Sequence, residues 1–173
     1  NFFDTNFKNI ILKSSDMICE DSINIKNSSG IINKIQIDNS YFDALDLDFS
    51  KIKINDLKVN NAKNDCIDFS FGEYEIIYAN LKNCGDKGLS VGERSKLNMH
   101  NGIIMYSNIG IASKDDAITN VKNVAMNNMN ICLAAYNKKK EFKGSKLNIK
   151  SLNCSQYNTL KQHKTTLDNK LQT

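Results

Sequence analysis

The stretch "DALDLDFSKIKINDLKVNNAKNDCIDFS" (residues 43–70) begins and ends with the same pattern, with the two copies 22 residues apart. In the first copy Asp46 stands between Leu45 and Leu47, and in the second Asp68 stands between Ile67 and Phe69. Alternation of apolar and polar residues is typical of a half-buried strand, although aspartate is a poor strand former. The stretch predicts a strand that recurs every 22 residues, with apolar side chains inward and carboxylates outward.

The same period continues along most of the chain, as in proteins built from internal repeats. One apolar column consists of Ile23, Leu45, Ile67, Leu89, Ile111 and Leu133. A column of small residues precedes it: Ser22, Ala44, Cys66, Gly88, Gly110 and Cys132. We expect the small residues to face outward, beside the carboxylates. Asparagine tolerates left-handed backbone in turns, and the turn columns Asn39, Asn61, Asn83 and Asn64, Asp86, Asn108, Asn130 show the same spacing.

Three short strands and three turns per repeat predict an all-β fold, a single-stranded parallel β-helix of about six to seven rungs. No single rung could bury its apolar face alone, so each must stack on its neighbours. A sandwich or barrel of antiparallel strands would instead show spacings of about 8–12 residues and has no reason to keep one register through six copies. The repeat therefore favours the β-helix.

We expect residues 1–154 to form the β-helix and residues 155–173 to form a polar C-terminal tail or cap. The register changes after Tyr136, because residues 145–152 match residues 117–124 at an offset of 28 instead of 22. The six extra residues predict a projecting loop within "NKKKEFKG" (residues 137–144).

The composition of the chain limits the kinds of partner that it could bind. The net charge of the 173 residues is +4 and the lysines are scattered, whereas nucleic-acid binding normally needs a basic stripe. No apolar segment approaches the roughly 20 residues of a membrane-spanning helix. No signal peptide is visible, but the chain opens on Asn1, which indicates a processed or excised piece. The oligomeric state stays open.

Five cysteines without a C-x-x-C pair argue against both a zinc site and a disulfide scaffold. We expect Cys66 and Cys132 to stand three rungs apart in the small column, about 14 Å by the strand spacing, which is too far for a disulfide.

Five aspartates, Asp43, Asp46, Asp48, Asp65 and Asp68, fall on two adjacent rungs of one predicted face. Like charges on neighbouring strands destabilise a sheet. A nearby lysine, a bound cation or a raised pKa on one of the carboxyl groups could relieve this repulsion. We expect Lys87 to stack on Asp65, whereas Asp46 over Asp68 has no visible counter-charge.

Three interpretations of this face stay open. Paired carboxylates suit glycosidic chemistry, and small residues beside them favour a groove in which a polymer could lie. Several oxygen ligands could also hold calcium, although the sequence has no D-x-D-x-D-G loop. Finally, the charges could serve only to keep a flat sheet soluble. "GDKGLSVGERS" (residues 85–95) lacks the phosphate-loop pattern, so we do not expect a nucleotide site.

The phrases "DALDLDFS", "DCIDFSFGE", "GDKGLSVGERS", "IGIASKDDA" and "AAYNKKKEF" resemble a right-handed parallel β-helix module of the pectate-lyase-like superfamily. This module is found in bacterial cell-surface and CotH-type spore-coat-related proteins, and the resemblance covers about residues 43–142. It implies a right-handed helix. In lyases, hydrolases and epimerases of the superfamily, polysaccharides lie along such a face. The matching residues are Asp65, Asp68, Asp86, Lys87, Ser90, Glu93, Ser95, Lys114 and Asp115.

The chain also departs from the superfamily. Cys66 stands where the module usually has glycine, and "EFKG" replaces its usual ending. The arginine base of pectate lyases and the N-T-D…D-D…G-H pattern of polygalacturonases are both missing, which argues against these two activities.

The sequence predicts a secreted or cell-surface domain that binds or processes a carbohydrate polymer along one strand face. The alternative is a structural or adhesive spacer of a larger surface protein, without activity. We predict no resident cofactor and no metal site, with calcium kept as an alternative. The central, potentially catalytic groups would be Asp46, Asp68, Lys87 and Lys114. The predicted ligand-binding residues are Asp43, Asp48, Asp65, Ser70, Asp86, Ser90, Glu93, Ser95, Asp115 and Tyr136.

Overall fold

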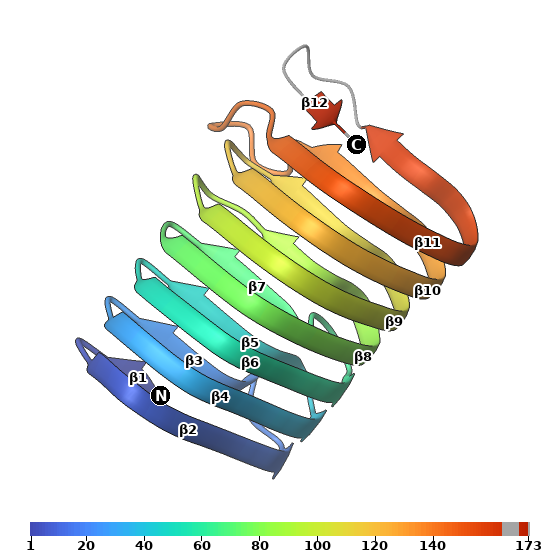
Figure 1. The fold of residues 1–173 in the computed structure, drawn as a ribbon. Coiled ribbons are helices and arrows are strands. Elements are labelled where there is room, and N and C mark those ends of the chain that lie inside the picture. Colours follow the sequence, from blue (N-terminus) through green and yellow to red (C-terminus); the bar gives the residue numbers. More distant parts are fainter. Residues whose placement is uncertain (164–169, 173) are drawn as a thin grey trace.

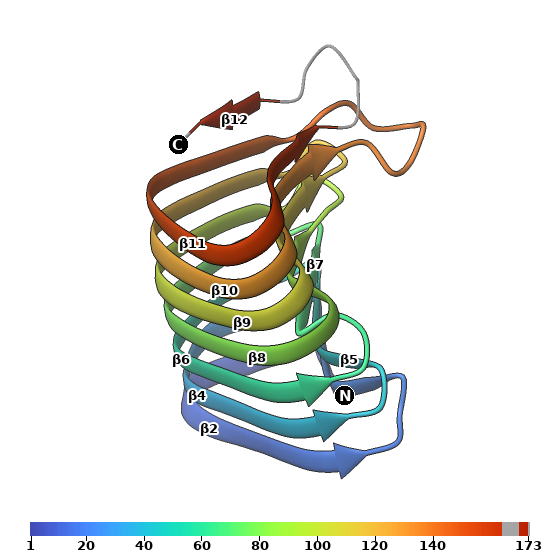
Figure 2. The same ribbon diagram turned by 90° about the vertical axis from the view of Figure 1, so that its right-hand side faces the viewer.

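The computed structural model describes residues 1–163 and 170–172. All regular structure in this part of the chain is β, and the strands pair in parallel within one 12-stranded sheet. The chain winds as a parallel β-solenoid of about six turns with a spacing of about 22 residues. Figures 1 and 2 show the turns stacked in sequence order. None of the described residues belongs to a helix long and apolar enough to cross a membrane.

The strands follow one another with short connections. They are β1 (Phe2–Phe3), β2 (Asn6–Met17), β3 (Asp21–Lys26), β4 (Ser29–Ser40), β5 (Asp43–Asp48), β6 (Lys51–Ala62), β7 (Ile67–Ser70), β8 (Glu73–Val91), β9 (Lys96–Lys114), β10 (Ile118–Tyr136), β11 (Lys146–His163) and β12 (Lys170–Gln172).

The ladder confirms the predicted register. Leu45 pairs with Ile23 on one side and with Ile67 on the other, and Ile67 pairs with Leu89. The offset becomes 28 between β10 and β11, where Val121 pairs with Ile149. The extra residues form the projecting loop after β10, residues 137–144, at the upper end of Figure 2. Residues 155–163, which the sequence assigned to a polar tail or cap, continue β11 in register with β10. Residues 164–169 and 173 of this predicted segment lie outside the described residues.

The sequence predicted three short strands in each turn, whereas the structure has fewer and longer strands per turn. The early turns alternate a six-residue and a 12-residue strand, as in β5 and β6, whereas β8, β9 and β10 each have 19 residues. The chain bends at Asn39 and Asn61, next to the ends of β4 and β6, and at Asn83 inside β8, where the φ angles are 59°, 64° and 56°. Asparagine adopts this left-handed conformation readily, which explains one of the asparagine columns.

The core consists of the inward apolar columns, and Leu45, Ile67 and Phe69 are fully buried. The small column was expected to face outward, and this expectation is wrong: Ala44, Cys66 and Cys132 are fully buried as well. The chain bends inward here. A side chain at Gly88 would place its Cβ 2.7 Å from Ile104 and 2.6 Å from the Gly110 carbonyl oxygen. Close packing at this corner therefore requires the small residues, and they do not line an open groove.

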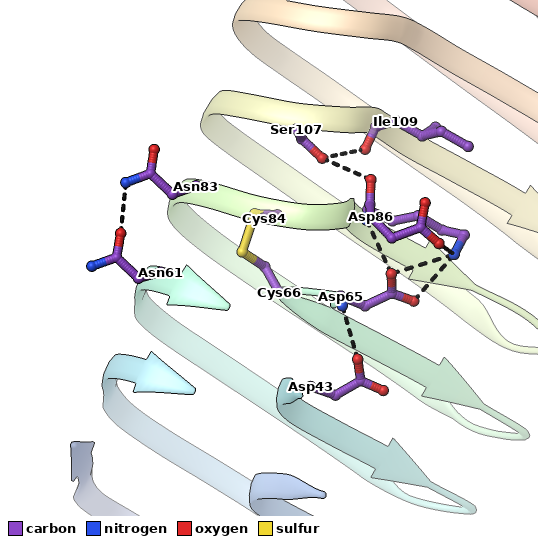
Figure 3. Close-up of a disulfide and its surroundings, with 10 residues drawn as sticks. Asp43, Asn61, Asp65, Cys66, Asn83, Cys84, Asp86, Ser107 and Ile109 are labelled. Atoms are coloured by element: carbon purple, nitrogen blue, oxygen red, sulfur yellow. Dashed lines mark hydrogen bonds and ion pairs between the residues drawn. A yellow bond between two sulfur atoms is a disulfide. The ribbon is translucent and has the colours of Figure 1, made fainter. Parts of the chain in front are cut away.

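The structure also overturns the expectation that the cysteines form no disulfides. Cys66 bonds to Cys84, as Figure 3 shows, and Cys132 bonds to Cys154, while Cys19 is free and exposed. Each bond joins two different columns that face each other across a corner of the solenoid. The repeat period places Cys66 and Cys132 in one column but does not tell which columns meet, so the two pairings could not be predicted from it.

Removal of the Cys66–Cys84 bond is expected to lower the free energy of unfolding. The bond closes a segment of 18 residues, for which the chain-entropy estimate is about 3 kcal/mol. Urea unfolding of the Cys66→Ala, Cys84→Ala double variant measures the loss, with Cys19→Ser as a control that should change little. Equal stabilities of the double variant and the wild type would contradict the bond.

Candidate functional site

The outward side chains of β3, β5 and β7 form one polar surface, which continues to Ser90 of β8; the next positions of this ladder, Ala112 and Ala134, are apolar and fully buried. Its central column follows the ladder from Asn24 through Asp46 and Asp68 to Ser90. We call the part of this surface that carries Asp43, Asp46, Asp48, Asp65 and Asp68 the acidic face. The predicted stacking of Asp46 on Asp68 is confirmed, because the two residues are ladder partners of β5 and β7.

Asp46 is a carboxylic acid in an environment that disfavours its charged form. Burial is the main cause, and the neighbouring carboxylates of Asp48, Asp21 and Asp68 add to it; together they raise the pKa of Asp46 to about 8. The side-chain amide of Asn24 donates a hydrogen bond of 2.6 Å to Asp46 Oδ2. Asp46 is therefore mostly protonated at neutral pH and can donate a proton.

Asp68 has a counter-charge that the sequence did not reveal. Lys114 Nζ lies 3.6 Å from Asp68 Oδ1 and donates a hydrogen bond of 2.8 Å to Ser90 Oγ. The expectation from the sequence that this column has no counter-charge is therefore wrong. Lys114 belongs to a turn two steps further along and extends back over Gly92, where a Cβ atom would lie 2.7 Å from Lys114 Cε. Gly92 leaves the space through which this lysine reaches Asp68.

The corner beside the small column contains a second polar ladder, shown in Figure 3. The Asp43 carboxylate accepts hydrogen bonds from the backbone N–H of Asp65, at 2.8 Å, and from the side chain of Asn64, at 2.7 Å. The Asp65 carboxylate in turn accepts the backbone N–H of Lys87 at 3.0 Å. These bonds offset the repulsion that the sequence predicts between Asp43 and Asp65.

Lys87 closes this ladder, as predicted. Its ammonium group lies 3.3 Å from Asp65 Oδ1 and also binds Asp86. Burial raises the pKa of Asp65 to about 6, although Lys87 counteracts it. Burial disfavours the charged form of Lys87, but the carboxylates of Asp65 and Asp86 outweigh this effect and raise its pKa. Lys87 is 8% exposed, so it holds the corner together and presents little surface to a ligand.

Two predicted ligand-binding residues, Glu93 and Asp115, instead hold the projecting loop. Glu93 is buried, accepts a hydrogen bond of 2.7 Å from Ser70 Oγ and forms an ion pair of 2.7 Å with Lys139. Asp115 is fully buried, and its Oδ1 accepts the backbone N–H groups of Lys138 and Lys139 at 2.7 and 2.9 Å. The loop is thereby fixed against the turns that border the acidic face.

The remaining predicted residues differ in accessibility. Asp48 is half-buried, and burial raises its pKa while Lys26 opposes the shift. Tyr136 is also half-buried, and burial raises the pKa of its hydroxyl. Ser90 and Ser95 are fully buried, and Ser95 Oγ has no hydrogen-bond partner among the described residues. The predicted residues that keep partial exposure, and that a ligand on this face could reach, are Asp43, Asp46, Asp48, Asp68, Ser70, Asp86 and Tyr136.

Three residues outside the predicted set also shape the site. Asn24 binds Asp46, Lys139 binds Glu93, and Asp21 is a ladder partner of Asp43 whose pKa burial raises to about 6. Asn24 and Asp21 stand in the repeat columns and could have been included. The run Lys138–Lys140 was visible in the sequence as a possible rim of the face, but the pairing of Lys139 with Glu93 does not follow from the repeat, because the loop lies outside it. Within residues 1–163 and 170–172, no three His, Cys, Asp or Glu side chains are arranged to hold a metal ion.

Comparison of the chain with protein-family models, with curated proteins and with solved structures found no match.

Proposed function

We propose that this chain is a secreted or surface-exposed β-solenoid domain that binds or processes a carbohydrate polymer along the acidic face. The observation that carries the proposal is the pairing of Asp46, whose pKa is raised to about 8, with Asp68, whose carboxylate lies beside the Lys114 ammonium group. Two neighbouring carboxyl groups in different environments can divide the roles of acid and base between them.

The strand spacing supports glycosidic chemistry in particular. Adjacent parallel strands lie about 4.8 Å apart, close to the roughly 5 Å between the two carboxyls of retaining glycosidases. In a hydrolase of this kind Asp46 would protonate the leaving oxygen, while Asp68 would attack the sugar or stabilise the positive charge on it. The Lys114 ammonium group, 3.6 Å from Asp68 Oδ1, would hold this carboxylate in position. A lyase or an epimerase would need the same pair as a proton donor and acceptor.

The proposed family and location are supported by separate features. The solenoid and the phrases shared with the pectate-lyase-like module, including its CotH-type surface proteins, support membership of that superfamily. The two disulfides suit an oxidising compartment, which supports secretion or exposure at the cell surface.

Binding to a panel of uncharged and amino-sugar polysaccharides, measured by affinity electrophoresis, tests this proposal. We expect Asp68→Asn to weaken retention of the polymer that the wild type binds, because Asp68 lies at the centre of the face. Asp56→Asn is the matched control, since it removes a partly exposed carboxylate from β6, away from the acidic face. Equal binding by all three proteins would exclude the site.

A second candidate function is that of a structural or adhesive spacer. It is favoured by the internal pairing of the charges: Lys87 with Asp65, Lys114 with Asp68 and Lys139 with Glu93. In this case no polysaccharide is bound on the acidic face, and Asp46→Asn changes stability alone.

A further inference from the structure

The projecting loop, residues 137–144, contains three consecutive exposed lysines, Lys138, Lys139 and Lys140. Nine residues, 137–145, separate β10 from β11, whereas the other connections between β1 and β11 have two to four residues. The loop stands away from the stacked turns at the upper end of Figure 2. Exposed loop tips are the preferred sites of proteolytic cleavage. Within residues 1–163 the loop is therefore the segment that a protease can reach most readily.

Basic residues elsewhere in the described chain are held by the solenoid. Within residues 1–163, the only lysine or arginine residues outside both the strands and the loop are Lys63 and Arg94. The backbone N–H of Lys63 donates to the Ser40 carbonyl oxygen at 3.2 Å, and that of Arg94 donates to the Asp115 carbonyl oxygen at 2.9 Å. Cleavage at a bonded backbone requires prior local opening, so these two positions are protected.

The tip of the loop lacks such protection. Lys140 and Glu141 form no hydrogen bond and no ion pair with any described residue. Lys139, by contrast, forms an ion pair of 2.7 Å with Glu93, and its carbonyl oxygen accepts the backbone N–H of Phe142 at 3.3 Å. The Lys140–Glu141 peptide bond is therefore the most accessible of those that follow a lysine in the run.

The two sides of this bond are anchored separately. On the side of β10, Asp115 Oδ1 accepts the backbone N–H groups of Lys138 and Lys139 at 2.7 and 2.9 Å. On the side of β11, Asp116 Oδ1 accepts the backbone N–H of Lys143 at 3.0 Å. A break at the tip leaves both anchors in place, because neither of them depends on the continuity of the chain between them.

A disulfide also spans the loop. Cys132 lies in β10 and Cys154 lies in β11, and the two are bonded to each other. The parallel ladder between these strands runs from the pair Ile118–Lys146 to the pair Ala135–His163. A chain that is cut in the loop therefore keeps its last turn, both by the ladder and by a covalent bond.

We propose that the projecting loop is a processing site for an endoprotease that recognises a basic side chain. A protease pocket that carries a carboxylate, as in trypsin, suits the exposed ammonium group of Lys140. Water adds across the Lys140–Glu141 peptide bond and leaves a carboxylate on Lys140 and an amino group on Glu141. The product consists of residues 1–140 and 141–173, joined by the Cys132–Cys154 bond and still folded. The proposal is independent of the acidic face.

Limited digestion of the folded protein by trypsin tests this site. We expect the first cut within residues 1–163 to produce a fragment that begins at Glu141, as identified by mass spectrometry. On a denaturing gel the cut protein should run as one species without reductant and as two species with it, because the disulfide holds the two parts together. The circular dichroism of the cut protein should keep the β signal of the intact protein.

A matched pair of variants assigns the cut to its residue. We expect Lys140→Gln to slow cleavage of the loop roughly tenfold, because a cut after Lys139 first requires the loss of its contacts with Glu93 and Phe142. Lys63→Gln is the control, since Lys63 is also exposed and outside a strand. It should leave the rate of loop cleavage unchanged.

Four results would overturn the proposal: a first cut at Lys63 or Arg94, equal rates of loop cleavage in Lys140→Gln and the wild type, release of residues 141–173 without reductant, or loss of the β signal on cutting. Each of them concerns the loop and the disulfide alone. The test of the acidic face by Asp68→Asn is decided separately.

Discussion

Replacement of Lys87 by methionine is expected to lower the free energy of unfolding by about 3–5 kcal/mol, the cost of removing one partner of a buried ion pair. The side chains of Lys87 and Asp65 are only 10% and 5% exposed. Without the ammonium group, the Asp65 carboxylate would stay buried beside Asp86 and Asp43. Methionine keeps most of the volume of the side chain, so the loss reports on charge and not on a cavity.

A double variant separates this effect from a general loss of packing. Lys87→Met combined with Asp65→Asn removes both charges, and we expect it to recover most of the stability that the single variant loses. Urea unfolding at pH 7 measures all three proteins. A double variant that is less stable than Lys87→Met would show that the pair does not have the assigned role.

The second large effect concerns pH. The pKa of Asp46 is about 8 in the folded protein and about 4 in an unfolded chain. Between these values the folded state binds more protons than the unfolded state, so the contribution of Asp46 to stability is complete below about pH 4 and falls as the pH rises towards 8. After allowance for its partial exposure to solvent, we expect a loss of a few kcal/mol between pH 5 and pH 8.5.

Asp46→Asn should remove most of this pH dependence and be more stable than the wild type at pH 8.5. A smaller slope should remain below about pH 6, because the pKa values of Asp21 and Asp65 are each raised to about 6. Thermal unfolding of both proteins across this range measures the difference. Parallel curves for the variant and the wild type would contradict the account of Asp46.

The sequence was sufficient where the repeat itself carries the information. The period places Leu45 above Ile23 and Asp68 above Asp46, and it places Lys87 beside Asp65, because residues 22 apart lie on neighbouring strands. The insertion after Tyr136 was also visible, because it shifts this period.

The period does not tell how the corners of one turn approach each other. Cys66 therefore could not be matched with Cys84, and Ala44 was assigned to the surface although it is fully buried. Long side chains cause a second kind of error. Lys114 reaches Asp68 across two turns because Gly92 leaves room for it, and a column-by-column reading considers only adjacent residues.

The central claim is that Asp46 is a protonated acid at neutral pH beside its ladder partner Asp68. A ¹³C NMR titration of the side-chain carboxyl groups tests it directly, with the Asp46 signal assigned by its absence from Asp46→Asn. The structure predicts a midpoint near pH 8 for this signal. A midpoint near pH 4, the value of an ordinary aspartate, would contradict the claim and remove the basis for an acid on this face.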